Sequence, residues 1–262
     1  MPEGHTVHRM AQDHTKWIGG QRLSVASPQG RFEQEAILLT GKVLKSVEAH
    51  GKHLYYTFGA KHTLHVHLGL YGKFRLHKSP PPEPRGAVRV RFVGSDHALD
   101  LNGPNQCKIL DKQGVIESQA RLGQDPLRAD ADPERVWTRI LKSKQPIGTL
   151  LLDQSIIAGI GNIYRAEILF LNRIHPSRPS KSLMRDEFDE LWQTSIRLLE
   201  IGLKYNRIIT VPRESTDKPL SRLNAQERLC VYKKDFCFQC AAPIESWSLG
   251  NRQIYACATC QH

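Results

Sequence analysis

The stretch from Leu151 to Phe170 reads LLDQSIIAGIGNIYRAEILF. Gly159 and Gly161 stand just before Asn162, and glycine permits a close backbone turn at this point. Helical spacing of apolar residues then runs from Asn162 to Leu171. The exposed N–H groups and the positive end of such a helix can bind a phosphate. A glycine–x–glycine pair also occurs in ordinary tight turns, so the pattern alone leaves both interpretations open.

Helical spacing extends on both sides of this stretch. It predicts helices over Pro133–Lys142, Ile147–Gln154 and Phe188–Leu203. Asp132 followed by a proline is a typical helix start, because aspartate caps free N–H groups and proline fits the first helical position. A further helix begins almost at the N-terminus and ends after Ile18, where two glycines follow.

The first half of the chain has a different pattern, with short alternating runs between Gly, Pro and Asn turns. Several short strands with such turns favour an antiparallel β-sandwich. The proline-rich segment 79–86 is interpreted as a surface loop, and 121–131 as a linker. The predicted strands are 43–47, 54–58, 63–68, 72–76 and 88–92.

The charge balance is strongly basic. Lys and Arg number 37 against 26 Asp and Glu, which gives a formal net charge of +11. Such a positive field favours polyanionic partners, because each neutralised phosphate releases counterions. Charge alone does not distinguish DNA from RNA or from anionic lipid. No apolar run approaches the ~20 residues of a membrane helix, and the N-terminus lacks the apolar core of a signal peptide. We therefore expect a soluble, cytoplasmic protein.

Four of the six cysteines form two CxxC pairs near the C-terminal end. Four thiolates at this spacing can converge tetrahedrally on one Zn²⁺, and so short a segment needs the metal to fold. The predicted site is structural because it leaves no open coordination position; two disulfides are the alternative. Cys107 and Cys230 are interpreted as buried or incidental thiols, and the histidines of segment 50–67 as core or groove residues rather than a metal site. The predicted zinc ligands are Cys237, Cys240, Cys257 and Cys260.

Three features together resemble the formamidopyrimidine-DNA glycosylase and endonuclease VIII family. They are the start Pro2-Glu3-Gly4, the stretch Leu151–Phe170, and the CxxC-x16-CxxC pattern with Arg252 before its second pair. The matches occur in the family's order over both halves of the chain. The chain is most similar to the bacterial endonuclease VIII branch.

The resemblance implies an α+β multidomain fold. An N-terminal antiparallel β-sandwich with flanking helices would occupy residues 1–120, followed by the linker 121–131. A helical domain with a helix-two-turn-helix element would occupy 132–229, and a zinc-finger β-hairpin 230–262.

The resemblance also implies a catalytic set. After removal of Met1, the secondary amine of Pro2 would be the nucleophile, and the positive end of the first helix would favour its neutral form. Glu3 would act as the general acid that protonates the opening sugar; the alternative is a carboxylate that merely favours the helix start. Lys52, in a turn between two strands, would bind phosphate and assist elimination. Arg252 is linked in family members to a second elimination.

Further residues match DNA contacts of the family. Asn162 and Arg252 would hold phosphates around the lesion, and Arg121 matches another DNA contact. Leu70 and Tyr71 resemble the side chains that fill the gap left by an everted base, although an aromatic at a hairpin turn is more commonly a packing residue.

Some positions depart from one or the other branch. Gly148 stands where a lysine is usual in the formamidopyrimidine branch, and Arg165 follows GNIY as in the endonuclease VIII branch. Both favour oxidised pyrimidines over 8-oxoguanine as substrates. Gly69 replaces one of three wedge residues, and Thr6 replaces a common second glutamate with no consequence that the sequence explains.

The resulting expectation is a monomeric base-excision-repair glycosylase with lyase activity, which binds double-stranded DNA containing oxidised bases or abasic sites and holds one structural Zn²⁺. Its DNA binding would associate it with the nucleoid. Three alternatives stay open. They are a non-catalytic damaged-DNA-binding protein of the same fold, a glycosylase that prefers 8-oxoguanine or formamidopyrimidine, and a zinc-ribbon protein that binds RNA or ribosomes.

Overall fold

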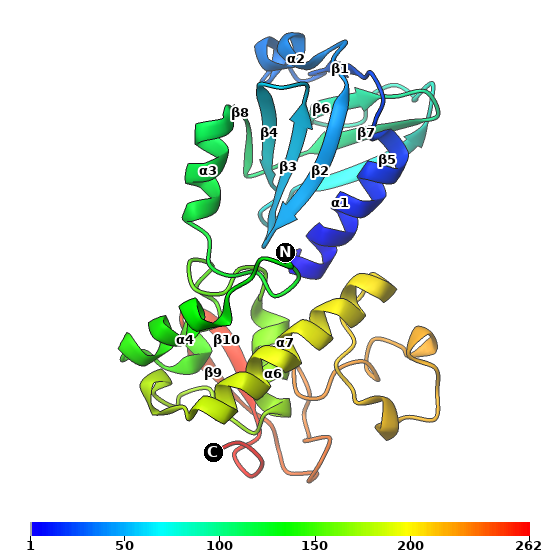
Figure 1. Ribbon diagram of the computed structural model, residues 1–262. Coiled ribbons are helices and arrows are strands. Elements are labelled where there is room, and N and C mark those ends of the chain that lie inside the picture. Colours follow the sequence, from blue (N-terminus) through cyan, green and yellow to red (C-terminus); the bar gives the residue numbers. More distant parts are fainter. Residues whose placement is uncertain (1) are drawn as a thin grey trace. The chain divides into compact units, whose positions relative to one another are not determined.

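The computed structural model describes residues 2–262 (Figure 1). Met1, whose removal the sequence analysis expects, lies outside the described residues. The chain forms two compact units. The first holds the residues up to Glu3 together with Val7–Arg121, and the second holds Gly4–Thr6 together with Leu122–His262. The start of the chain therefore contributes to both units.

Two four-stranded antiparallel sheets form the body of the first unit, which confirms the predicted sandwich. One sheet has the order β1-β6-β7-β5 and the other the order β2-β3-β4-β8. Apolar side chains from both sheets, including Tyr56, Phe58 and Phe92, form one buried core. The strands are β1 (Ser24–Ala26), β2 (Leu44–His50), β3 (His53–Phe58), β4 (His62–His67), β5 (Lys73–Lys78), β6 (Val88–Val93), β7 (His97–Asn102) and β8 (Gln106–Leu110).

Three helices accompany this sandwich: α1 (Gly4–Ile18), α2 (Glu33–Leu39) and α3 (Lys112–Ala120). The predicted first helix is confirmed and ends before Gly19, as expected. It contributes His14 to the sandwich core, where Nδ1 lies 2.7 Å from the Tyr56 hydroxyl. Burial lowers the pKa of His14 to about 3, so this imidazole is neutral.

The sequence did not predict β1, β7 or β8, and β7 shows why. This strand carries Asp100, a charged residue that interrupts an apolar run, yet Asp100 is only 1% exposed. Its carboxylate accepts hydrogen bonds from Arg91 Nε at 2.7 Å and Nη2 at 2.8 Å, and His77 Nε2 lies 3.1 Å away. The pairing across neighbouring strands makes burial of this carboxylate possible.

Helices dominate the second unit. The predicted helices Pro133–Lys142 and Asn162–Leu171 are confirmed at both ends, and the Asp132 side chain accepts from the Glu134 N–H at 3.0 Å as expected of an N-cap. The elements are α4 (Pro133–Lys142), α5 (Ile147–Leu150), α6 (Asn162–Leu171), α7 (Arg185–Tyr205) and the 3-10 turns η1 (Ser180–Ser182), η2 (Arg213–Ser215) and η3 (Leu220–Arg222).

The helix predicted over Ile147–Gln154 is wrong in length, since α5 ends at Leu150. The Asp153 side chain accepts from both the N–H and the hydroxyl of Ser155, and such a local side-chain turn competes with a continuing helix. The helix predicted over 188–203 is longer in the structure, because Glu187 accepts from the Met184 N–H at its start.

β9 (Glu245–Leu249) and β10 (Arg252–Ala256) form an antiparallel hairpin that lies between the two cysteine pairs. Its turn is Gly250–Asn251, and both residues have positive φ. Figure 1 shows this hairpin next to α6, and Phe170 of α6 and Ile254 of β10 share one buried cluster. Within the described part of the chain, no helix is both long and apolar enough to cross a membrane.

Candidate functional site

The start of the chain is held by a close backbone contact. The Gly4 N–H donates to the carbonyl of Gly159 at 2.8 Å. A Cβ on Gly4 would lie 2.8 Å from the Cα of Gly159, which is closer than any side chain tolerates. The glycine of the Pro2-Glu3-Gly4 pattern therefore permits this approach. Pro2 and Glu3, by chain connectivity, lie within two residues of it.

Glu3 is the residue before α1 and is only 5% exposed. Its side chain makes no capping hydrogen bond to the helix. His5, two residues further on, is buried, and its ring lies perpendicular to that of Tyr164 with the centroids 5.3 Å apart. Burial lowers the pKa of His5 to about 4.

Lys52 lies in the two-residue turn Gly51–Lys52 of the β2–β3 hairpin, as predicted. The turn needs a positive φ at Gly51. Lys52 is 7% exposed, which is unusual for a lysine. Burial, and to a lesser extent the Lys52 charge, lowers the pKa of His67. The Lys52 ammonium thus lies near enough to the His67 imidazole to disfavour its protonation.

Next to Lys52, the histidines of β3 and β4 form a stacked row. His53 Nδ1 lies 2.8 Å from His65 Nε2, and the His53 ring also stacks on His67. Burial first, and neighbouring positive charges second, lower the pKa of His53 to about 3. Among the described residues, the geometric metal-binding group is the four cysteines and not these histidines.

Leu70 and Tyr71 form the tip of the loop between β4 and β5. They are 56% and 85% exposed, so neither serves as a packing residue in this structure. Gly69 has a positive φ, and a Cβ there would lie 2.8 Å from the Cβ of Asn105. The absent side chain at Gly69 therefore lets the loop before β8 approach this tip.

The glycine turn before α6 is built by Gln154, which sequence analysis missed. Gln154 Oε1 accepts from the Gly159 N–H at 3.0 Å, and Nε2 donates to the carbonyl of Ile160 at 2.9 Å. Gly159 has a φ of 98°, which favours glycine. The signal that could have found Gln154 is its amide side chain a few residues before a glycine pair.

Asn162 and Arg252, both predicted phosphate contacts, are brought together by the structure. Asn162 Nδ2 donates to the carbonyl of Gln253 at 2.9 Å, so the first residue of α6 is bonded to the residue after Arg252. Arg252 is exposed at the start of β10. Arg121, at the C-terminal end of α3, is exposed and belongs to the first unit.

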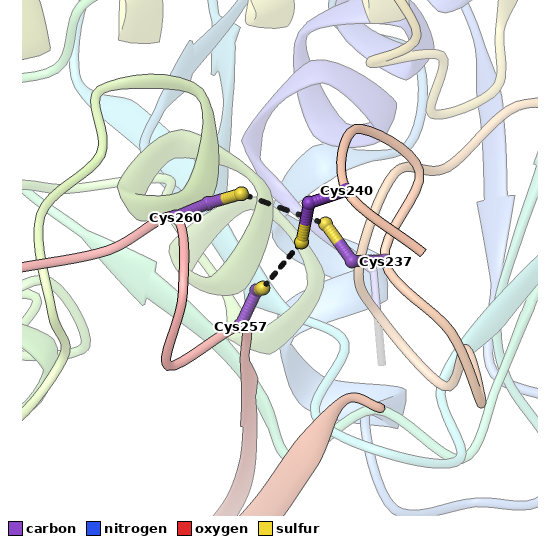
Figure 2. Close-up of side chains that lie close together, drawn as sticks. All are labelled: Cys237, Cys240, Cys257 and Cys260. Carbon is purple, nitrogen blue, oxygen red and sulfur yellow. Dashed lines mark hydrogen bonds between the residues drawn. The ribbon is translucent and has the colours of Figure 1, made fainter. Parts of the chain in front are cut away.

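The four predicted cysteine ligands converge (Figure 2). Their sulfur atoms all lie within 4.8 Å of one another. Cys237 Sγ lies 3.8 Å from Cys260 Sγ, and Cys240 Sγ lies 3.5 Å from Cys257 Sγ. Sulfur ligands at 2.3 Å from a tetrahedral Zn²⁺ would be about 3.8 Å apart. The cluster therefore fits one metal ion, with all four positions filled by protein.

These features define a class of protein, and comparison with known proteins agrees. Residues 1–107 match the formamidopyrimidine-DNA glycosylase N-terminal domain, and residues 122–213 match the formamidopyrimidine-DNA glycosylase H2TH domain. The chain belongs to the formamidopyrimidine-DNA glycosylase and endonuclease VIII family, and it is a DNA glycosylase.

Comparison with individual relatives shows which members of the family the chain is similar to. It is 44% identical to "Endonuclease 8 1" of Mycobacterium tuberculosis, with 100% of both chains covered. It is 30% identical to the formamidopyrimidine-DNA glycosylase of Mycoplasmopsis pulmonis, over 100% of this chain and 97% of the relative. The structure is similar to the Lactococcus lactis Fpg solved in complex with DNA containing an abasic site. That similarity has a TM-score of 0.82 and 26% identity, and it covers 99% of each chain.

Proposed function

We propose that this glycosylase excises oxidised bases from double-stranded DNA and then cuts the strand, with the amine of Pro2 as the nucleophile. The observation that carries the proposal is the close contact of Gly4 with Gly159, which requires the glycine of the Pro2-Glu3-Gly4 start. Full-length identity of 44% to a protein named endonuclease 8 supports the same chemistry.

The proposed reaction proceeds through a covalent intermediate. The neutral nitrogen of Pro2 forms a bond to C1′ of the damaged nucleotide, while the bond from C1′ to the base breaks; the base leaves with the electron pair and takes up the N–H proton that Pro2 loses. Glu3 donates a proton to the ring oxygen, which opens the sugar and leaves a Schiff base on Pro2. Loss of the C2′ proton then expels the 3′ phosphate, and a second elimination expels the 5′ phosphate. Hydrolysis finally frees Pro2.

Other residues would bind the strand during these steps. We assign phosphate contacts to Lys52, Asn162 and Arg252, with Lys52 and Arg252 also assisting the eliminations. Leu70 and Tyr71, both exposed at a loop tip, would fill the gap left by the everted base. The exposed guanidinium of Arg121 would contact a further phosphate.

Gly148 and Arg165 favour oxidised pyrimidines, such as thymine glycol or dihydrouracil, as the substrates. The four cysteines would hold one structural Zn²⁺, which organises the hairpin that carries Arg252 and supplies no catalytic step. We also propose domain limits at 1–120, 132–229 and 230–262, with 121–131 as linker. The protein would act as a monomer associated with the nucleoid.

Borohydride trapping tests this proposal. The wild-type protein should form a covalent adduct with an oligonucleotide that carries one oxidised pyrimidine, because borohydride reduces the Schiff base. Pro2→Gly should lose most of the adduct, whereas Pro84→Gly, a change in the surface loop, should keep it. No adduct with any lesion in a panel of single oxidised bases would favour a non-catalytic damage-binding protein. Stronger trapping on 8-oxoguanine than on the pyrimidines would overturn the substrate assignment.

A further inference from the structure

Arg165 of α6 is a fully buried arginine within the second unit, with 0% exposure. Every hydrogen-bond acceptor that it contacts is a neutral oxygen rather than a carboxylate. On one side, Nη2 donates to Asn162 Oδ1 at 2.6 Å, and Nη1 to the carbonyl of Gly148 at 3.1 Å. On the other side it donates to three carbonyls of the hairpin, those of Leu249 at 2.9 Å, Gln253 at 3.3 Å and Arg252 at 3.4 Å.

These bonds close a ring around Asn162. Arg165 donates to its Oδ1, its Nδ2 donates to the carbonyl of Gln253, and the same carbonyl accepts from Arg165. The ring leaves the Asn162 amide only one orientation, since a flipped amide would place two donors against each other. It also fixes the backbone of Arg252 relative to the first turn of α6.

Gly148 makes this arrangement possible from the opposite side. A Cβ on Gly148 would lie 2.9 Å from Leu249 Cδ2 and 2.9 Å from the carbonyl of Pro176. A side chain there would press on the backbone carbonyl of Pro176 and displace the side chain of Leu249, the residue whose carbonyl accepts from the Arg165 guanidinium. The hydrogen bonds of Arg165 to the hairpin therefore require a residue without a side chain at Gly148.

The charge of Arg165 has the sign that a phosphate requires. Burial, and secondly the neighbouring Arg252, lowers its pKa to about 10, which still leaves it charged at neutral pH. With carbonyl partners only, this charge is not neutralised locally and adds to the positive end of α6. Because Arg165 is buried, it acts through exposed neighbours and not by direct contact.

We propose that Arg165 and Gly148 form a positioning pair, which presents the amide of Asn162 and the guanidinium of Arg252 together to one DNA phosphate. This inference rests on the proposed function, because it takes Asn162 and Arg252 as phosphate contacts. Gly148 and Arg165 are the two residues that distinguish this chain from the formamidopyrimidine branch. The proposal gives both the same role, which is to position the residues that bind the DNA strand.

A double-mutant cycle of DNA binding, made in the full-length, zinc-loaded protein, tests the roles of Arg165 and Gly148. The ligand is a duplex with a stable abasic analogue, and fluorescence anisotropy measures Kd between about 50 and about 200 mM salt. Arg165→Met should weaken binding roughly tenfold and reduce the salt slope by about 1, as loss of an exposed phosphate contact would. Arg165→Lys should not restore binding, because one ammonium cannot span both groups of acceptors. Arg135→Met, an exposed arginine of α4, is the control for lost charge.

The decisive comparison uses the Arg252→Ala background. If Arg165 acts through Arg252, Arg165→Met should cost much less there than in the wild type, because positions that act as a unit are not additive. Gly148→Ala keeps the arginine and should reproduce part of the loss, which keeps the test valid if Arg165→Met folds poorly. Equal losses in both backgrounds, or a loss matched by Arg135→Met, would overturn the inference. If the double-mutant cycle gives the expected result but borohydride trapping fails, the proposed function is wrong and the positioning role of Arg165 and Gly148 stands.

Discussion

Glu167 of α6 is a fully buried carboxylate that four donors from distant segments share. Its Oε1 accepts from the backbone N–H groups of Val231 at 2.9 Å and Tyr232 at 2.7 Å. Its Oε2 accepts from the N–H of Cys230 at 2.8 Å and from the hydroxyl of Thr210. This carboxylate therefore fixes the segment that leads into the first cysteine pair.

Glu167→Gln should destabilise the second unit strongly while keeping the side-chain shape. One oxygen becomes an NH₂ group. If Oε1 is replaced, two N–H groups lose their acceptor; if Oε2 is replaced, the Cys230 N–H loses it, while the Thr210 hydroxyl can donate to the Arg228 carbonyl instead. Hydrogen bonds to a charged group contribute about 1.5–3 kcal/mol each. Burying a neutral amide costs less than burying a carboxylate, which offsets part of the loss. We expect a net decrease of about 3 kcal/mol in the free energy of unfolding.

Urea unfolding and hydrogen exchange measure this effect. Glu200→Gln makes the same chemical change at an exposed position of α7 and should alter stability by less than about 0.5 kcal/mol. Exchange of the Cys230, Val231 and Tyr232 amides should accelerate in Glu167→Gln but not in the control. A loss below about 1 kcal/mol with unchanged exchange of these three amides would refute the reasoning.

Two further predictions concern the metal and pH. Chelation of the metal should remove the NMR signals typical of the β9–β10 hairpin while those of the sandwich persist, because the metal would tie the cysteine pair before the hairpin to the pair after it; a hairpin unchanged after verified metal removal would contradict the site. His14 has its pKa lowered from 6.5 to about 3 by burial, so between these values the unfolded chain binds a proton that the folded chain does not. The free energy of unfolding should therefore fall as pH falls through this range. His14→Gln should flatten that slope by up to about 1.4 kcal/mol per pH unit, and an unchanged slope in urea titrations would exclude the assignment.

The sequence predicted features whose causes are local. The bounds of α4 follow from Asp132 and the proline after it, and the turn at Lys52 follows from the glycine before it. The helix after Ile147 was predicted too long because the Asp153 side chain, and not apolar spacing, decides where it ends. Strand β7 was missed because Asp100 is stabilised by an arginine on another strand.

The residues of the candidate site likewise fall into those that a local sequence pattern predicted and those that depend on distant contacts. The resemblance to the family pointed to Pro2, Glu3 and Lys52, each of which belongs to a short local pattern, and the CxxC spacing alone pointed to the cysteines. Gln154 and Glu167 were missed although both lie in the most informative stretch. The partners of Glu167 are 43 to 65 positions away in sequence, and no local pattern reports such contacts. The joint role of Gly148 and Arg165 likewise required the hairpin carbonyls to be located.

The bond from Gly4 to Gly159 has a consequence for how the protein matures. Its two ends are 159 − 4 = 155 residues apart in the chain, so at synthesis rates of about 5–20 residues per second the ribosome needs roughly 8 to 30 s to supply the second partner. During that interval the nascent amino terminus is accessible to the aminopeptidase that would uncover the Pro2 amine. In the folded chain Gly4 and His5 are buried, while Pro2 is half-buried. Trimming slower than this interval would leave chains that fold before Met1 is removed, and mass spectrometry of freshly made protein can count them.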